Sequence, residues 1–384
     1  MKTLHKHKSK KKLEHERALS HIQSSAKSDL YISEIDRRCK NVAIGAVVVW
    51  ICLGSIAYSI GYYTGRLERL TGVEQRAPMA ASMLLGMSVV SSLLPMTYRW
   101  KKGQEMTGII TAGMIVQFVA FTTDFMLCAL PVPVFIDPIT GARVFALRWS
   151  EWTPLAFVMT FMTEVCRVDS GEMDRLANTQ TNPLHGLVDV FSSSDRSHDD
   201  LSGTKDHKKS SKEVSSNYVD RVNIDTGPAY SLALCQALST FCGFLFPHIK
   251  NMIAWIITML ISCALFLVMY YRLYKRYHLF QKMKIGSSIS EQEMFHWARL
   301  SLGLLATCTA LWSFLVFAYF VYSIGPLILT EQKFLHTRGI VMICECSIDV
   351  LFKSVYMLLI VDVHNAIFSP NERSQRRLEE LREV

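Results

Sequence analysis

The sequence predicts an all-α membrane protein with eight transmembrane helices and both chain ends in the cytoplasm. Half of the 384 residues are hydrophobic, and they gather in blocks that approach the roughly 20 residues a helix needs to cross the hydrocarbon layer. Lysine and arginine cluster outside these blocks, and the positive-inside rule places such clusters on the cytoplasmic side. If the chain crosses the membrane eight times, the main clusters of lysine and arginine all lie on the cytoplasmic side.

The predicted spans differ in how apolar they are. Seven blocks are apolar along their length, whereas the eighth is interrupted by Arg148 and Glu151. Hydropathy alone would score this eighth block poorly, so its assignment depends on a motif described below. The seven apolar blocks are about residues 41–63, 79–98, 105–130, 229–247, 251–273, 299–325 and 339–362, and the eighth is about 142–166.

Residues 1–40 are predicted to form a basic cytoplasmic segment. The run from Lys6 to Lys12 is too polar and too basic for a signal peptide, so the block at 41–63 is expected to remain as an additional transmembrane helix. The net charge of +8 then comes mainly from basic residues at the cytoplasmic face of the membrane, where the run can contact anionic lipid. No nucleic-acid partner is expected, because no binding domain accompanies the run.

Residues 167–228 change in composition to small, polar and charged side chains. Such a segment cannot bury a core, so we expect a disordered cytoplasmic loop. The chain carries no phosphate-binding glycine loop, His-Glu-x-x-His motif or serine elbow, so no catalytic residues are expected. Cys344, Glu345 and Cys346 lie within a predicted span without a second pair of ligands, so no metal site is expected.

Lys353 lies in the middle of the last apolar block, four residues after Asp349. A lysine near the bilayer midplane costs several kcal/mol unless it is paired or chemically modified. One helical turn places the two side chains on the same face, roughly 6 Å apart. The pair therefore indicates an amine with its counter-ion, and the alternative is a buried ion pair that only locks helices together.

A second charged pair occurs in the interrupted block, where Arg148 precedes Glu151 and Trp152. The arginine and the carboxylate lie on one helix face. A helix starting near Gly141 would carry Glu151 to about the depth of Asp349, and two carboxylates would then flank the lysine nitrogen. The alternative is an extracellular hairpin with charges on its surface.

Together these residues resemble the microbial, type I rhodopsins. The third helix of that family's bundle has an Arg-x-x-acid-Trp pattern and the seventh an Asp-x-x-x-Lys pattern, and both patterns occur here. In the sixth helix, Trp312 is followed by Tyr319 and Gly325 at the family's spacing. The resemblance covers residues 79–365 and implies a seven-helix rhodopsin bundle, to which residues 41–63 add one N-terminal transmembrane helix.

The resemblance implies all-trans retinal joined to Lys353 as a protonated Schiff base. This buried cation would lose its proton to desolvation without carboxylates nearby. Glu151 matches the primary counter-ion and proton acceptor, and Asp349 matches the second counter-ion. Arg148 would help to keep both ionised.

Aromatic side chains complete the pocket that the resemblance implies. Trp152 and Trp312 match the positions that sandwich the polyene, and Tyr319 matches a further pocket position. Ordinary aromatic core packing is the alternative for all three. Asp124 is an additional acid on the preceding span, where it would join the counter-ions as a third carboxylate or lie as a polar group near the outer interface.

Departures from the family pattern bear on whether the chain works as a light-driven proton pump. Proton pumps of the family carry a carboxylate roughly three turns cytoplasmic of the counter-ion, and Met162 occupies that position here. Glu164 lies close by, so a local shift could bring it into that role. Leu315 and Val316 stand where the family commonly has tyrosine and proline, which puts the details of the pocket in doubt.

The additional N-terminal helix resembles the eight-span rhodopsins that are fused to cytoplasmic enzymes. Residues 366–384 are expected to form a helical linker to a missing output domain, a cyclase, phosphodiesterase or histidine kinase, in a homodimer. A natural helical end is the alternative. We therefore expect a light-sensing, signal-transmitting module. The rival function is a light-driven proton pump or a light-gated ion channel, and a third reading makes Lys353 purely structural.

Overall fold

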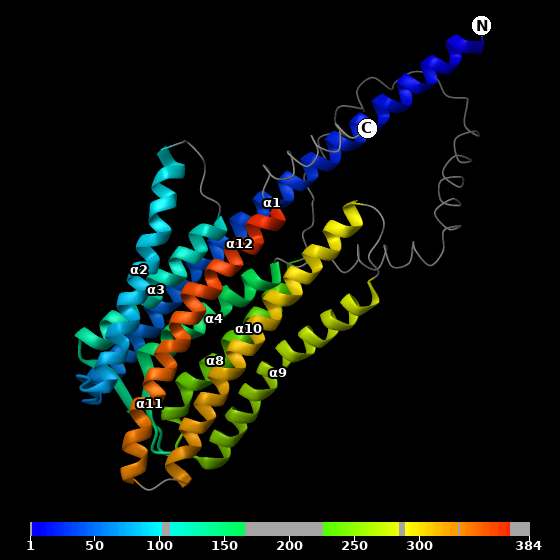
Figure 1. Cartoon of the computed structure of the whole chain (residues 1–384). Helices are drawn as coiled ribbons and strands as arrows, with labels where there is room; N and C mark the ends of the chain where they lie inside the picture. Colours follow the sequence, from blue (N-terminus) through cyan, green and yellow to red (C-terminus); the bar gives the residue numbers. More distant parts are fainter. Residues whose placement is uncertain (1, 102–107, 166–225, 284–288, 329–330, 369–384) are drawn as a thin grey trace, which may run out of the picture. The chain divides into compact units, whose positions relative to one another are not determined.

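The computed structural model describes residues 2–101, 108–165, 226–283, 289–328 and 331–368, which are almost entirely helical (Figure 1). Both the predicted loop at 167–228, up to residue 225, and the predicted linker from residue 369 onward lie outside the described residues. The helices are α1 (Lys2–Tyr63), α2 (Val73–Lys101), α3 (Gly108–Ala129), α4 (Ala146–Val165), α8 (Gly227–Leu245), η1 (Phe246–His248), α9 (Met252–Lys282), α10 (Ile289–Ile328), α11 (Glu331–Val350), η2 (Leu351–Tyr356) and α12 (Met357–Phe368).

The chain divides into two units. The first comprises Met1–Arg37 and Asp174–Asp225, and its described part is the beginning of α1, where Arg37 pairs with Glu34 one turn earlier. The second comprises Arg38–Met173 and Thr226–Val384. All the other described elements belong to this second unit, which contains every residue discussed below.

Six helices of the described residues are long and apolar enough to cross a membrane, so the chain is an integral, multi-pass membrane protein. Neither α4 nor the continuous rod of α11, η2 and α12 is among the six. Each of these two rods carries three buried acidic, lysine or arginine side chains, which lower its hydropathy. They are Arg148, Glu151 and Glu164 on α4 and Glu345, Asp349 and Lys353 on the C-terminal rod.

Each of the eight blocks predicted as spans corresponds for most of its described length to one helical rod of the structure. The first rod, α1, begins far upstream of residue 41, so the basic N-terminal residues continue the helix. Within the second unit, a side chain at Gly54 of α1 would meet Leu147 and Ser150 of α4. Close approach through small residues is typical of helix packing in membranes.

The prediction of a purely helical fold is wrong in one detail, a small antiparallel sheet. Its strands are β1 (Leu67–Glu68), β2 (Val132–Ile136) and β3 (Arg143–Phe145), in the order β1-β2-β3. Strand β3 pairs with β2 from Val134 opposite Phe145 to Ile136 opposite Arg143. The residues at 142–145 are therefore not helical.

The turn between β2 and β3 explains why α4 begins after residue 141. Gly141 adopts a φ of +69°, a left-handed conformation that favours glycine. The Asp137 carboxylate accepts hydrogen bonds from the backbone nitrogens of Ile139 and Thr140, as in an Asx turn. Helix α4 starts at Ala146, directly after the strand, and every residue of it except Phe157 is buried. This makes α4 the central helix of the unit.

The C-terminal rod changes its winding at the lysine. Residues Leu351–Tyr356 form a π-helical turn, and Lys353 lies within it. A π-helical turn holds one extra residue and is frequently found at functional sites. The turn alters which side chains of the rod face α4 and α10 beyond this point.

Candidate functional site

The buried amine of Lys353 is the centre of the site. Its Nζ donates hydrogen bonds to Oε1 of Glu151 and Oδ1 of Asp349. All three side chains are at most 4% exposed. Helix α4 contributes Glu151, and the C-terminal rod contributes Asp349 and Lys353. The structure thus brings together the three residues that the two sequence motifs singled out, and the alternative of a surface hairpin around Glu151 is wrong.

Arg148 connects this amine to further acids. Its Nη2 donates to Oδ1 of Asp124 at 2.8 Å, and its Nη1 lies 3.5 Å from Oδ2 of Asp349. Its Nε lies 3.9 Å from Oε2 of Glu345. Asp124 is fully buried on α3. It therefore belongs to the charged cluster, which it joins through Arg148.

Glu345 is the site residue that the sequence interpretation missed. The sequence interpretation places Glu345 only in a Cys-Glu-Cys motif, for which no metal site is expected. Its position was nevertheless a signal, because Glu345, Asp349 and Lys353 follow one another at intervals of four residues. That spacing places three ionisable side chains on one helix face.

The cluster contains more acids than bases. Two cations, Arg148 and Lys353, face four carboxylates, so the formal charge is 2 − 4 = −2 if all are ionised. A buried charge is tolerated only when it is paired and hydrogen-bonded. The surplus of carboxylates therefore provides more than one acceptor for a proton that leaves the amine. The four acids are Asp124, Glu151, Glu345 and Asp349.

Two tryptophans flank the amine. Trp152 Nε1 donates to Oδ1 of Asp349 at 2.8 Å, which fixes both the indole and the carboxylate. Trp312 of α10 packs on Phe352, with ring centroids 4.8 Å apart. Both tryptophans line one cavity together with Lys353. The structure thus places the predicted sandwich pair beside the amine.

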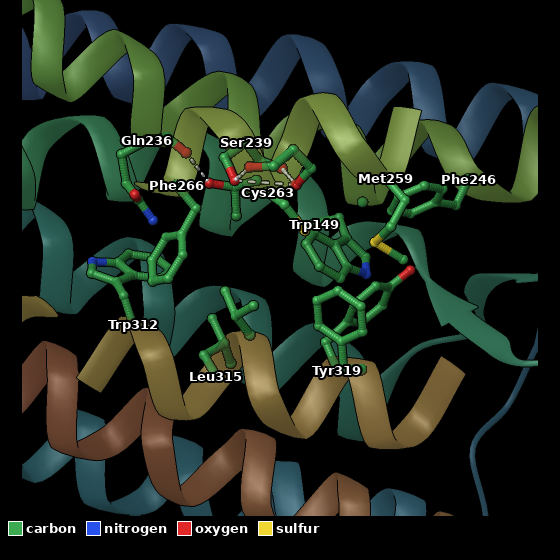
Figure 2. Close-up of a pocket in the computed structure, with 15 residues that line it drawn as sticks. Trp149, Gln236, Ser239, Phe246, Met259, Cys263, Phe266, Trp312, Leu315 and Tyr319 are labelled. Atoms are coloured by element: carbon green, nitrogen blue, oxygen red, sulfur yellow. Dashed lines mark hydrogen bonds between the residues drawn. The ribbon is translucent and has the colours of Figure 1, made fainter. Parts of the chain in front are cut away.

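A second cavity continues beyond Trp312 and Leu315, which line both cavities. Figure 2 shows its walls, contributed by α4, α8, α9 and α10. Tyr319 lies in this second cavity, where its ring is 5.0 Å from that of Trp149. Both of the positions that depart from the family, Leu315 and Val316, also line it.

Gly243 of α8 allows Trp149 to lie in this wall. A Cβ atom at residue 243 would come within 2.1 Å of the Trp149 ring. Real Cβ atoms do not approach other atoms so closely, and protein interiors have no spare volume to absorb the overlap. The glycine is therefore required for the present shape of the second cavity.

The residues beyond the amine, toward the C-terminal end of α4, form a separate polar group. Arg276 of α9 donates to Oε2 of Glu164 at 2.6 Å and to Oγ of Ser301 at 3.2 Å. Glu164 is 3% exposed. Met162, at the position where the sequence comparison expects an inner proton donor, is fully buried and apolar.

Tyr356 connects the π-helical turn to the same region. Its hydroxyl lies 2.7 Å from that of Thr163 and donates to the carbonyl oxygen of Leu304 at 3.1 Å. Three helical rods meet at this hydroxyl, namely α4, α10 and the C-terminal rod. A rotation of the rod at Lys353 would therefore disturb the contacts of Tyr356 with both α4 and α10.

No family model and no curated protein match this chain. Among solved structures, it is similar to the transmembrane domain of Salpingoeca rosetta rhodopsin phosphodiesterase, with a TM-score of 0.48 and 13% identity over 84% of this chain and 97% of that one. It is also similar to the proton-pumping rhodopsin AR2 from the marine alga Acetabularia acetabulum, with a TM-score of 0.48 and 11% identity over 79% of this chain and 99% of that one.

A third similar structure is the thermophilic rhodopsin from Rubrobacter xylanophilus, with a TM-score of 0.44 and 13% identity over 75% of this chain and 97% of that one. At such identities and TM-scores, the function of this chain has to be argued from its own side chains. Those side chains form a buried primary amine, a set of carboxylates around it and an aromatic cavity that leads away from it.

Proposed function

We propose that this chain is a retinal-binding light sensor of the microbial rhodopsin type. The observation that carries the proposal is the position of Lys353, whose Nζ lies between Glu151 and Asp349 where an aromatic cavity begins. Among the described side chains, Lys353 is the only buried lysine. A structural ion pair alone would not account for the cavity that adjoins the amine.

The residues fit retinal as the cofactor. A primary amine condenses with an aldehyde, with loss of water, to give an imine whose protonated form is a cation. The two carboxylates at Lys353 would stabilise that cation, which otherwise loses its proton in an apolar environment. The cavity beyond the amine is apolar and aromatic, as an extended polyene requires. Trp152 and Trp312 would hold the polyene between them.

The charged side chains around Lys353 have different proposed roles in holding the Schiff-base proton. Glu151 and Asp349 would hold the proton at Nζ in the dark, and Glu151 would be its acceptor after illumination. Arg148 positions Asp349 and offsets part of its charge. The Trp152 indole keeps the Asp349 carboxylate oriented toward the amine. When bound, retinal supplies the light absorption and the change of shape.

The signal would pass through the C-terminal rod. Trp312 and Phe352, whose rings are in contact, would move when the chromophore changes shape, and Tyr356 would pass this motion from the π-helical turn to α4 and α10. We propose eight spans with cytoplasmic termini, so that α12 leads toward a cytoplasmic output domain. This output domain would be a cyclase, phosphodiesterase or histidine kinase in a homodimer, and its activity would change when the rod moves.

The residues on the proposed cytoplasmic side of the amine favour a sensor over a proton pump. Met162 has no proton to give, and Glu164 is held by Arg276 at 2.6 Å. Fast reprotonation of the amine from the cytoplasm would need a free acid at this depth. A light-driven pump or a light-gated channel is the alternative function, and light-dependent current in a membrane patch would establish it in place of the sensor.

The test is a visible absorption spectrum of the protein purified after expression with all-trans retinal. We expect a visible band that hydroxylamine bleaches under illumination, because hydroxylamine attacks the imine carbon of the Schiff base and releases the retinal from the lysine as its oxime. A folded protein that shows no visible band in the presence of retinal would return Lys353 to the role of a structural ion pair.

A further inference from the structure

One polar side chain in the second cavity lacks a partner. Gln236 of α8 is 2% exposed and lines the cavity, and Figure 2 shows its amide pointing toward Trp312. Its Oε1 has no hydrogen-bond partner among the described residues. A buried amide oxygen that receives no hydrogen bond destabilises the protein. A group that donates a hydrogen bond is therefore expected at this point of the cavity.

The neighbouring hydroxyl groups are already engaged. Thr240 donates to the backbone oxygen of Gln236 at 2.6 Å. Ser239 and Ser262 donate to each other's backbone oxygens, both at 2.9 Å, and their hydroxyl oxygens lie 3.1 Å apart. None of these hydroxyls needs a ligand. Gln236 is thus the polar group of this wall that a bound molecule could satisfy.

The position of Gln236 along the cavity indicates which part of a ligand it would meet. Lys353 lines the first cavity, and Gln236 lines the second, which lies beyond Trp312 and Leu315. A retinoid attached to Lys353 would enter the second cavity with the end that carries its ring. Retinal is a pure hydrocarbon apart from its aldehyde, so it offers no donor there.

We propose that this cavity takes a retinoid with a hydroxyl group on its ring, and that this hydroxyl donates a hydrogen bond to Oε1 of Gln236. The proposal rests on the proposed function and names its ligand more closely. A net hydrogen bond contributes about 0.5–1.5 kcal/mol, and 1.4 kcal/mol corresponds to a factor of ten. We expect about a tenfold preference for a ring-hydroxylated retinal over retinal.

A water molecule beside Gln236 is the competing explanation. A buried water needs two to four polar partners, whereas most of the cavity wall is aromatic or aliphatic. The indole Nε1 of Trp312 is the other polar atom of the lining that has no partner among the described residues. If a water satisfies these groups, plain retinal and its hydroxylated form should bind alike.

The test is a competition for the apoprotein of the full chain between all-trans retinal and all-trans 3-hydroxyretinal or 4-hydroxyretinal. The bound retinoid is released with hydroxylamine and quantified. We expect the wild type to prefer at least one hydroxylated retinal about tenfold. Gln236→Leu should reduce that preference to about one, because the leucine keeps the volume and removes the acceptor.

Gln117→Leu is the matched control. Gln117 is another glutamine with 2% exposure, it accepts a hydrogen bond from Ser92, and it does not line either cavity. This variant should keep the wild-type preference. Equal binding of all three retinoids by the wild type, or a preference that survives in Gln236→Leu, would overturn the proposal. Failure of every retinoid to form a pigment would instead contradict the proposed function.

Discussion

The guanidinium of Arg148 and the carboxylate of Asp124 form a buried ion pair, with Nη2 and Oδ1 2.8 Å apart and both side chains at most 1% exposed. This pair joins α3 to α4. Arg148 also lies within 3.5 Å of Asp349, so Asp124 influences Lys353 through one intervening cation. A residue that acts in this indirect way should affect stability more than colour.

We predict that Asp124→Asn lowers the melting temperature of the pigment and shifts its absorption band only slightly. Removal of one partner of a buried ion pair typically costs about 3–5 kcal/mol, and the remaining contacts of Arg148 to Asp349 and Glu345 should reduce this loss. Thermal bleaching and the absorption maximum measure the two effects. A spectral shift as large as that of Glu151→Gln would instead place Asp124 in direct contact with the chromophore.

We predict that Glu151→Gln shifts the visible band to the red. The positive charge of the protonated Schiff base is localised at the nitrogen in the ground state, and a weaker counter-ion stabilises that state less. The absorption spectrum of the variant measures the shift. An unchanged spectrum would transfer the role of primary counter-ion to Asp349, which shares the amine.

We predict that Glu164 and Arg276 act as a structural pair. Glu164→Gln and Arg276→Gln should lower the melting temperature by similar amounts, and the double variant should lose less than the sum, because residues in contact are not additive. Both single variants should retain the wild-type rate at which the chromophore recovers after a flash. A slower recovery in Glu164→Gln alone would identify Glu164 as a proton donor and favour the pump.

We predict that Gly243→Ala disturbs the second cavity. The added Cβ atom would overlap the ring of Trp149, and overpacking of this kind costs about 1–3 kcal/mol. A lower melting temperature and a displaced absorption band are expected. Gly45→Ala is the matched control, because a Cβ atom there meets nothing within 4 Å. Equal effects of the two changes would contradict the role given to Gly243.

The sequence was sufficient to predict the helices and the centre of the site. Long apolar blocks dictate helices in a membrane, because every backbone hydrogen bond must be made within the segment. The pairing of Lys353 with Asp349 follows from helical spacing. Their meeting with Glu151 was expected from matched depths in two helices, but a surface hairpin remained the alternative, since spacing within one helix does not determine how two distant helices face each other.

Other features depended on tertiary contacts. The start of α4 at Ala146 is determined by the pairing of β3 with β2, and three residues of β3 give little signal on their own. The pairing of Arg148 with Asp124 joins positions 24 residues apart on two helices. Whether Oε1 of Gln236 receives a hydrogen bond depends on which side chains surround it in space, and the sequence alone does not show this.

The central claim is that retinal binds covalently to Lys353. The most direct measurement is reduction of the reconstituted protein with borohydride, followed by mass spectrometry of its peptides. We predict a retinyl adduct on the peptide that contains Lys353, and neither an adduct nor a visible band in Lys353→Ala. An adduct on another lysine, or a visible pigment that persists in Lys353→Ala, would contradict the account.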